Sequence, residues 1–135
     1  MTIEWVRFGH LLGASVWTGG LIVLAFVVMA LRRAGAERPH LQAMAKAFGR
    51  VSWTAMGLAL VTGMVQVFEL GQAATNPNAP FGRALFVKLL LVGLAAALAL
   101  GHQMTAGTAS PRVRGIVQGL ILVVSVGIFA AATAL

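Results

Sequence analysis

The segment Ile3–Leu31, IEWVRFGHLLGASVWTGGLIVLAFVVMAL, decides the fold class of this protein. After Arg7 it contains no charged side chain before Arg32. At about 1.5 Å of rise per residue, such a segment is long enough to cross the ~30 Å hydrocarbon core as a helix. The whole chain of 135 residues is 59% hydrophobic and only 10% charged, which favours an integral membrane protein over a soluble domain.

Three further apolar segments follow, at Ala47–Leu70, Gly82–Thr105 and Pro111–Leu135. Backbone polar groups cannot remain unpaired in lipid, so each segment is expected to be a helix. The sequence therefore predicts an all-α fold, an integral membrane antiparallel four-helix bundle that forms one domain over residues 1–135. Ser110 before Pro111 has the pattern of a helix N-cap.

The basic residues are distributed unevenly between the two predicted faces. Ten Lys and Arg against three acidic residues give a formal net charge of +7. One face contains Arg32, Arg33, Arg38, Lys46, Arg50, Arg112 and Arg114, and the other contains Arg7, Arg83 and Lys88. The positive-inside rule predicts a multi-pass protein of the cytoplasmic (inner) membrane with both termini outside. This topology accounts for the charge without nucleic acid as a partner. The absence of cysteine excludes disulfides and thiolate metal sites.

Several polar side chains are predicted to share one depth near the outer side. Position along each helix places His10 about 10 Å, and Met64 and Lys88 about 9 Å, from that edge, with Gln66 slightly shallower. Trp17 follows His10 by nearly two turns and is expected on the same face. We therefore expect these five residues to line an outward-facing site, with Glu69, shallow like Gln66 on the second helix, as a further candidate.

Each of these side chains also has a plainer interpretation. An intramembrane histidine is a functional hypothesis by default, but His10 can instead bond to a backbone carbonyl or to interfacial water. Lys88 either extends to the headgroups or neutralises an anionic group. Met64 and Trp17 can be packing residues, or a thioether ligand and a flat wall for a planar ligand.

The third segment has a stripe of its own, Lys88, Val92, Ala95, Ala99 and His102, at three- and four-residue steps. His102 then lies about 30 Å from the outer edge, so it cannot bind the same ion as His10, because ligand atoms approach a metal to about 2 Å. His102 with Met104 is a candidate second site on the inner side, and the alternative is an interfacial side chain.

Two motifs resemble a known family. His10, Trp17, Gly19 and Gly20 in the first segment, and Gly82 with Lys88 in the third, resemble the copper-resistance protein D (CopD) family. The same outline is similar, more distantly, to the HemJ-type protoporphyrinogen oxidases, which bind b-type haem. The aromatic and Pro-containing signature usual after the first-helix Trp in that second group is missing here.

The resemblance implies copper handling or translocation at the membrane, through His10 and Met64. Soft Cu(I) accepts imidazole and thioether ligands. The alternative is a haem b redox protein, with His10 as an axial ligand and Lys88 or Arg83 paired with propionates. A second alternative is a small accessory subunit of a membrane complex. Whether the protein is an enzyme stays open, and the expected partners are the lipid bilayer and either further copies of the chain or a larger complex.

Overall fold

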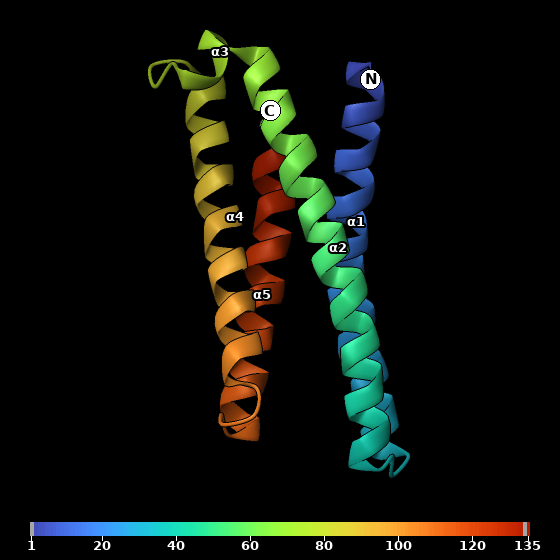
Figure 1. Ribbon diagram of the computed structural model, residues 1–135. Coiled ribbons are helices and arrows are strands. Elements are labelled where there is room, and N and C mark those ends of the chain that lie inside the picture. Colours follow the sequence, from blue (N-terminus) through green and yellow to red (C-terminus); the bar gives the residue numbers. More distant parts are fainter. Residues whose placement is uncertain (1, 134) are drawn as a thin grey trace. The chain divides into compact units, whose positions relative to one another are not determined.

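The structure is a computed structural model that describes residues 2–133 and 135. The described residues form five α-helices, and no strand is found among them (Figure 1). Four of these helices, α1, α2, α4 and α5, are long and apolar enough to cross a membrane. The predicted all-α, membrane-type fold is therefore confirmed. The helices belong to two compact units, residues 2–70 and 71–135.

The first unit is a hairpin of α1 (Ile3–Arg33) and α2 (Arg38–Leu70). The helices run antiparallel, because Gly13 of α1 meets Ala55 and Ala59 of α2 whereas Gly20, further along α1, meets the earlier residue Phe48. The buried positions of α1 recur at three- and four-residue steps, as expected for one helix face against its partner. They are Val6, Gly13, Trp17, Thr18, Leu21 and Leu24.

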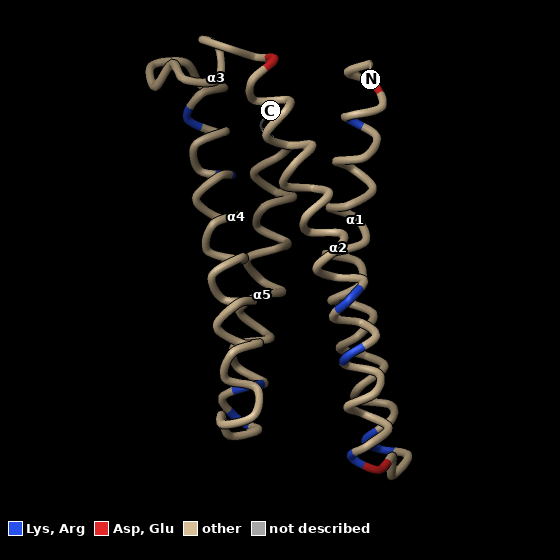
Figure 2. The backbone as a smooth tube through the Cα atoms, viewed as in Figure 1, with Lys and Arg blue, Asp and Glu red and all other residues tan. Residues whose placement is uncertain are grey.

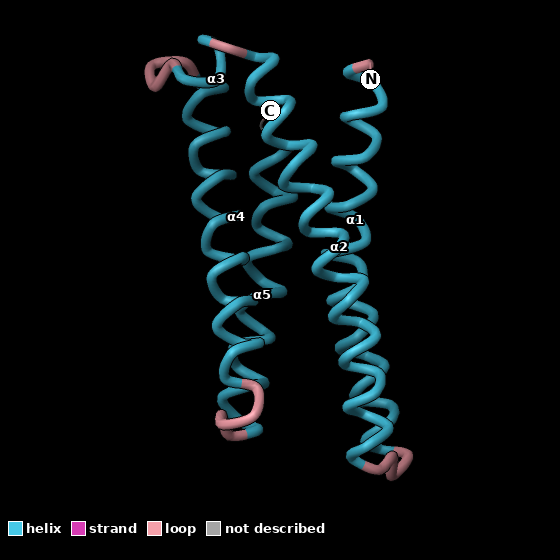
Figure 3. The backbone as a smooth tube through the Cα atoms, in the orientation of Figure 1, coloured by secondary structure: helices cyan, strands magenta, loops and turns pink. Residues whose placement is uncertain are grey.

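A tight turn closes this hairpin after α1, as the short loop in Figure 3 shows. Gly35 has a φ of 77°, in the left-handed region that glycine enters without a steric penalty. The Gly35 amide donates to the carbonyl of Arg32, and the Ala36 amide donates to the carbonyl of Leu31. This pair of bonds is the Schellman pattern, which satisfies carbonyls at a helix end that would otherwise lack partners.

Helix α2 begins at Arg38, nine residues before the predicted start at Ala47. The predicted start of the second helix was therefore wrong, and most of the stretch between Leu31 and Ala47 is helical. Hydropathy identifies only the apolar part of a helix. The first part of α2, Arg38 to Lys46, contains polar residues, so the apolar pattern did not include it. Leu, Gln, Ala, Met and Lys are good helix formers, and Pro39 lies in the first turn, where its missing amide costs nothing.

The second unit contains the short α3 (Gln72–Thr75) and the hairpin of α4 (Pro80–Thr105) and α5 (Pro111–Ala132). The predicted cap of α5 is confirmed, because the Val113 amide donates to Ser110 Oγ at 3.3 Å. Helix α5 ends at Ala132, three residues short of the predicted end, and Ala134 lies outside the described residues. Gly82 is buried against the preceding loop, where a Cβ atom would collide with the carbonyl of Asn76.

Most of the charged residues in each unit lie toward the ends of the helices (Figure 2). Arg32, Arg33 and Arg38 lie at the turn between α1 and α2, and Lys46 and Arg50 follow along α2. In the second unit Arg112 and Arg114 lie just after the turn between α4 and α5, whereas Arg83 and Lys88 lie toward the other end of α4. Each hairpin thus has a basic turn.

Candidate functional site

His10 lies on α1 and is half-buried against α2. Its Nδ1 atom is 2.8 Å from the carbonyl oxygen of Ala59. The neighbouring positions on α2 are Thr62, whose Oγ1 is 3.5 Å from the same nitrogen, and Gly63, whose Cα faces the ring. We refer to Ala59, Thr62 and Gly63 together as the His10 seat.

Gly63 provides the space that the imidazole occupies. A Cβ atom at this position would be 3.0 Å from Cε1 and 3.2 Å from Nδ1 of His10, closer than ordinary van der Waals contact. On α1, a Cβ at Gly9 would lie 3.3 Å from the Thr62 methyl group. Small residues therefore bring the two helices together around the ring, as is common where membrane helices pack closely.

The hydrogen bond to Ala59 determines the tautomer of His10. A carbonyl oxygen can only accept, so Nδ1 of His10 must carry the proton and donate it. In the neutral ring the lone pair is then on Nε2, the nitrogen further from the backbone. One of the two interpretations of His10, a bond to a backbone carbonyl, is confirmed for Nδ1. The same bond is the usual way in which a metal-ligating histidine is oriented.

Thr62 and Gln66 are largely occupied by bonds within α2. The Thr62 hydroxyl donates to the carbonyl of Leu58 at 2.5 Å, and its oxygen faces His10 only at the longer distance given above. Gln66 Nε2 donates to the carbonyl of Thr62 at 3.2 Å. Gln66 thus lies one turn beyond the His10 seat on the same face of α2, where its amide bonds to its own helix.

Met64 does not join His10 in the hairpin. Met64 follows Gly63 by one residue, which turns its side chain about 100° around the helix from Gly63. The angles that separate Met64 from Ala59 and Thr62 are larger still. Its side chain is 63% exposed, whereas Thr62 is buried. Met64 therefore leaves α2 on the side away from α1, although its depth along the helix matches that of His10 as predicted. His10 and Met64 thus share a depth, but Met64 is not on the face of α2 that contacts His10.

Trp17 lies on the buried face of α1, with 8% of its surface exposed. It follows His10 by nearly two turns, and both lie toward the packed side of the helix, as predicted. Gly13 lies between them on this face, where a Cβ would be 2.7 Å from the carbonyl oxygen of Ala55. At Gly57 of α2, by contrast, a Cβ would meet nothing within 4 Å.

The remaining candidates belong to the second unit. Lys88 is half-buried on α4, and Arg83 is exposed close to the start of the same helix. The predicted stripe on α4 is visible in the burial pattern, because Ala95 and Ala99 are buried and Lys88, Val92 and His102 are half-buried. The roles of Lys88 and Arg83 as partners of an anionic group stay predictions.

His102 and Met104 do not form a pair on α4. His102 is half-buried, while Met104 is 76% exposed. Two residues turn a helix by about 200°, so the side chains leave on opposite sides. In the part of the chain that the structure describes, no group of three or more His, Cys, Asp or Glu side chains is arranged to hold a metal ion.

The sequence did not reveal the role of the Ala59 carbonyl. A backbone acceptor has no sequence signature of its own. The available signal was the small residues Ala59, Thr62 and Gly63 at three- and four-residue steps on α2, which mark the face that another helix can approach closely. Comparisons with protein-family models, with curated proteins and with solved structures found no match to this chain.

Proposed function

We propose that this protein is a redox protein of the cytoplasmic membrane that holds a b-type haem, with Nε2 of His10 as an axial ligand. The observation that supports this most directly is the 2.8 Å hydrogen bond from Nδ1 of His10 to the Ala59 carbonyl. That bond puts the lone pair on Nε2 and fixes the plane of the ring. A bound haem would supply one-electron chemistry at its iron.

Haem needs less from the protein than copper does. The porphyrin provides four ligands to its iron, so one oriented imidazole is a sufficient protein contribution. A Cu(I) site built from His10 and Met64 needs both side chains within about 2 Å of the same ion. His10 leaves α1 toward the His10 seat on α2, whereas Met64 leaves α2 on the side that faces away from this seat. This geometry favours haem over copper as the group at His10.

Copper handling remains the second proposal, because the two motifs of the CopD-like resemblance support it. His10, Trp17 and Gly20 lie on one helix of the hairpin, and Gly82 is buried near the start of α4. In this proposal the second ligand must come from a residue other than Met64 of the same hairpin. The two proposals therefore differ in their dependence on Met64 as well as in the cofactor.

Purification in detergent separates the proposals. A haem protein shows a Soret band that is lost in His10→Ala and retained in His40→Ala, a matched control because His40 is exposed in the first turn of α2. Met64→Leu should leave this band unchanged. A colourless wild type that also takes up no haemin would contradict the haem proposal.

Metal analysis of the same samples tests the copper proposal. Copper that co-purifies with a colourless protein and is lost in His10→Ala supports copper handling. Loss of copper in Met64→Leu would contradict our assignment of Met64 to the far side of α2. A protein with neither haem nor copper would favour the accessory-subunit alternative.

We further propose that the basic turn of each hairpin faces the cytoplasm, so that both termini lie outside. The Lys and Arg residues near these turns outnumber those at the other helix ends. The absence of native cysteine makes labelling straightforward. A cysteine at Ala36 should react with a membrane-impermeant maleimide only after the membrane is opened, and a cysteine at Thr2 should react in intact cells. The reverse pattern would contradict this orientation.

A further inference from the structure

The first part of α2, from Arg38 to Arg50, has two faces of different character. Toward α1 it presents Met44 and Phe48, which are half-buried, and Phe48 packs against Gly20. Four polar side chains on this part are exposed and recur at four-residue steps, which places each about one turn beyond the last. We call them the basic face of α2: Arg38, Gln42, Lys46 and Arg50.

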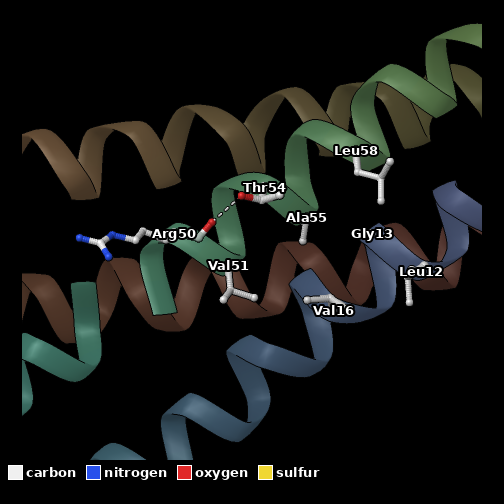
Figure 4. A pocket seen from close by; sticks show the side chains of 8 residues that line it. All are labelled: Leu12, Gly13, Val16, Arg50, Val51, Thr54, Ala55 and Leu58. Atoms are coloured by element: carbon white, nitrogen blue, oxygen red, sulfur yellow. Dashed lines mark hydrogen bonds between the residues drawn. The ribbon is translucent and has the colours of Figure 1, made fainter. Parts of the chain in front are cut away.

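The basic face points away from α1. Lys46 is two residues from both Met44 and Phe48, which turns its side chain about 200° around the helix from each of them. Figure 4 shows the guanidinium of Arg50 extending away from the apolar side chains that lie between α1 and α2. Thr54 continues the row by one turn, and its hydroxyl donates to the Arg50 carbonyl at 2.8 Å, the dashed line in Figure 4. The charges of the row therefore end at Arg50.

The register of the hairpin gives the depth to which this face reaches. Phe48 packs against Gly20 and the helices run antiparallel, so Arg50 is level with α1 near Thr18. That level is about 20 Å along α1 from Arg32, which lies at the turn. The basic face therefore extends from the turn to near the middle of α1.

The exposed side chains of α1 at these levels are apolar. By the same register Ile22 is level with Lys46, and Phe26 is level with Gln42. Ile22 is 40% exposed and Phe26 is 70% exposed. From Phe8 to Leu31 the sequence has no charged residue, as a helix in hydrocarbon requires. Two sides of one hairpin at one depth thus require different surroundings, lipid beside α1 and a polar medium beside the basic face.

Among the described residues of the first hairpin, no carboxylate side chain is near Lys46 or Arg50. The acidic residues of the sequence are Glu4, Glu37 and Glu69. Glu37, just before α2, is about 14 Å from Lys46 and about 20 Å from Arg50 along the helix, and Glu69 is about 28 Å from Arg50. Glu4 lies near the far end of α1. Residues 71–135 contain no Asp or Glu, so the second unit has no acidic side chain that could neutralise the basic face.

Water is the remaining means of solvating these charges. Long basic side chains near a helix end can extend to the membrane surface, but the side chain of Arg50 is too short to cover the distance to the turn. Charged residues within membrane helices face the interior of a bundle or a water-filled cavity, because a charge in hydrocarbon is costly. The basic face is exposed and not packed against another part of the hairpin.

We propose that water follows the basic face of α2 into the membrane as far as Arg50. The space beside this face is then a vestibule, open on the side of the membrane where the α1–α2 turn lies, and its cations concentrate small soluble anions. A cleft with charges of one sign beside a low-dielectric wall raises the local concentration of counter-ions in this way. The inference does not depend on the group bound at His10 or on which side of the membrane the turn faces.

Single cysteines test the depth of the water, because the native chain contains none. Gln42→Cys and Lys46→Cys report on the basic face, and Phe26→Cys and Ile22→Cys are their matched controls at the same levels of α1. The full chain is placed in lipid nanodiscs, so that a water-soluble maleimide reaches both sides of the membrane. The maleimide reacts with the thiolate, which forms in water and not in lipid, so the two α2 cysteines should react about tenfold faster than their controls.

Arg50→Cys marks the inner end of the vestibule and should also react faster than the α1 cysteines. Equal rates at the matched positions would overturn the proposal. Fast reaction on both helices would mean that this half of the hairpin stands outside the membrane. Slow reaction on both would mean that lipid or protein covers the basic face.

The charge of the vestibule is tested at Gln42→Cys, because this position is uncharged and has Arg38 and Lys46 one turn to either side. The rates of a sulfonate-bearing and a trimethylammonium-bearing methanethiosulfonate are measured there at low salt. Adding Lys46→Gln removes a charge about 6 Å away, which in water changes the two rates about threefold in opposite directions, so the ratio of sulfonate to ammonium rates should fall about tenfold. Arg7→Gln, about 30 Å away, should leave the ratio unchanged. Equal ratios in the two double variants would overturn the cation-lined vestibule.

A measurement on the wild type avoids the question of whether a variant folds. In the ¹⁵N-labelled full chain, a water-soluble gadolinium chelate should broaden the amide resonances of Gln42 to Arg50, and a nitroxide on a lipid acyl chain should broaden those of Ile22 to Met29. Broadening of both segments by the same probe would overturn the proposal. So would protection of the basic face from both probes, as a second copy of the chain or another protein on this face would cause.

Discussion

The substitution Gly13→Ala tests the closest approach in the first hairpin. The added methyl group would be 2.7 Å from the Ala55 carbonyl oxygen and 2.9 Å from the Ala59 amide nitrogen. Both neighbours are backbone atoms of α2, so no side chain can rotate away. The helices must separate by about 0.7 Å to reach the 3.4 Å at which ordinary contact begins.

Two opposing effects determine the change in stability. Replacing Gly by Ala within a helix favours folding by up to about 1 kcal/mol in water. Overpacking at a rigid contact costs about 1–3 kcal/mol, and the separation also lengthens the bond from His10 to Ala59 on the next turn. We therefore expect Gly13→Ala to unfold more easily than the wild type.

Gly57→Ala is the matched control, because it makes the same change in α2 where a Cβ meets nothing within 4 Å. It should be neutral or slightly stabilising. Unfolding in mixed micelles with increasing sodium dodecyl sulfate gives the free energies of both variants. We expect Gly13→Ala to be about 1–3 kcal/mol less stable than Gly57→Ala. Equal stabilities would refute the close contact between the backbones of α1 and α2.

Three other changes have expected outcomes. Gly63→Ala should push the His10 ring out of its seat and shift or broaden the Nδ1–H resonance of a ¹⁵N-histidine-labelled sample, whereas an unchanged resonance would argue against the seat. Gly35→Ala should lower the free energy of unfolding by about 1–2 kcal/mol, because alanine is strained at this positive φ, and denaturant titration would measure it. Ser110→Ala should destabilise α5 by about 1 kcal/mol through loss of its cap, observable as faster amide hydrogen exchange at Val113; an unchanged rate would count against the cap.

The number of long helices could be predicted because hydropathy and lipid thickness act on whole segments. The cap at Ser110 was also predictable, since its signal is local. The early start of α2 was not found, because the polar residues from Arg38 to Lys46 interrupt the apolar pattern while still favouring a helix. Lipid compatibility and helix formation are separate properties, and the sequence pattern measured only the first.

The His10 site was predictable in depth but only partly in direction. Position along a helix gives depth, and this placed His10 and Met64 at similar levels. Which face of α2 meets α1 depends on where the two backbones approach, at Gly13, and on where α2 leaves room for the His10 ring, at Gly63. A rotation of 100° per residue then separates Met64 from His10. Helical-wheel angles measured from the glycines would have found this separation.

The acceptor that orients His10 belongs to the main chain and not to a side chain. No substitution at position 59 can therefore delete it, and any small residue there leaves the imidazole held in the same way. Substitution of Ala59 by Ser or Gly should therefore leave the orientation of the ring unchanged. His10 and Gly63, which provides the space for the ring, do not tolerate substitution in this way. The orientation of the ring can therefore be lost only through a change at these two positions or through movement of the helices.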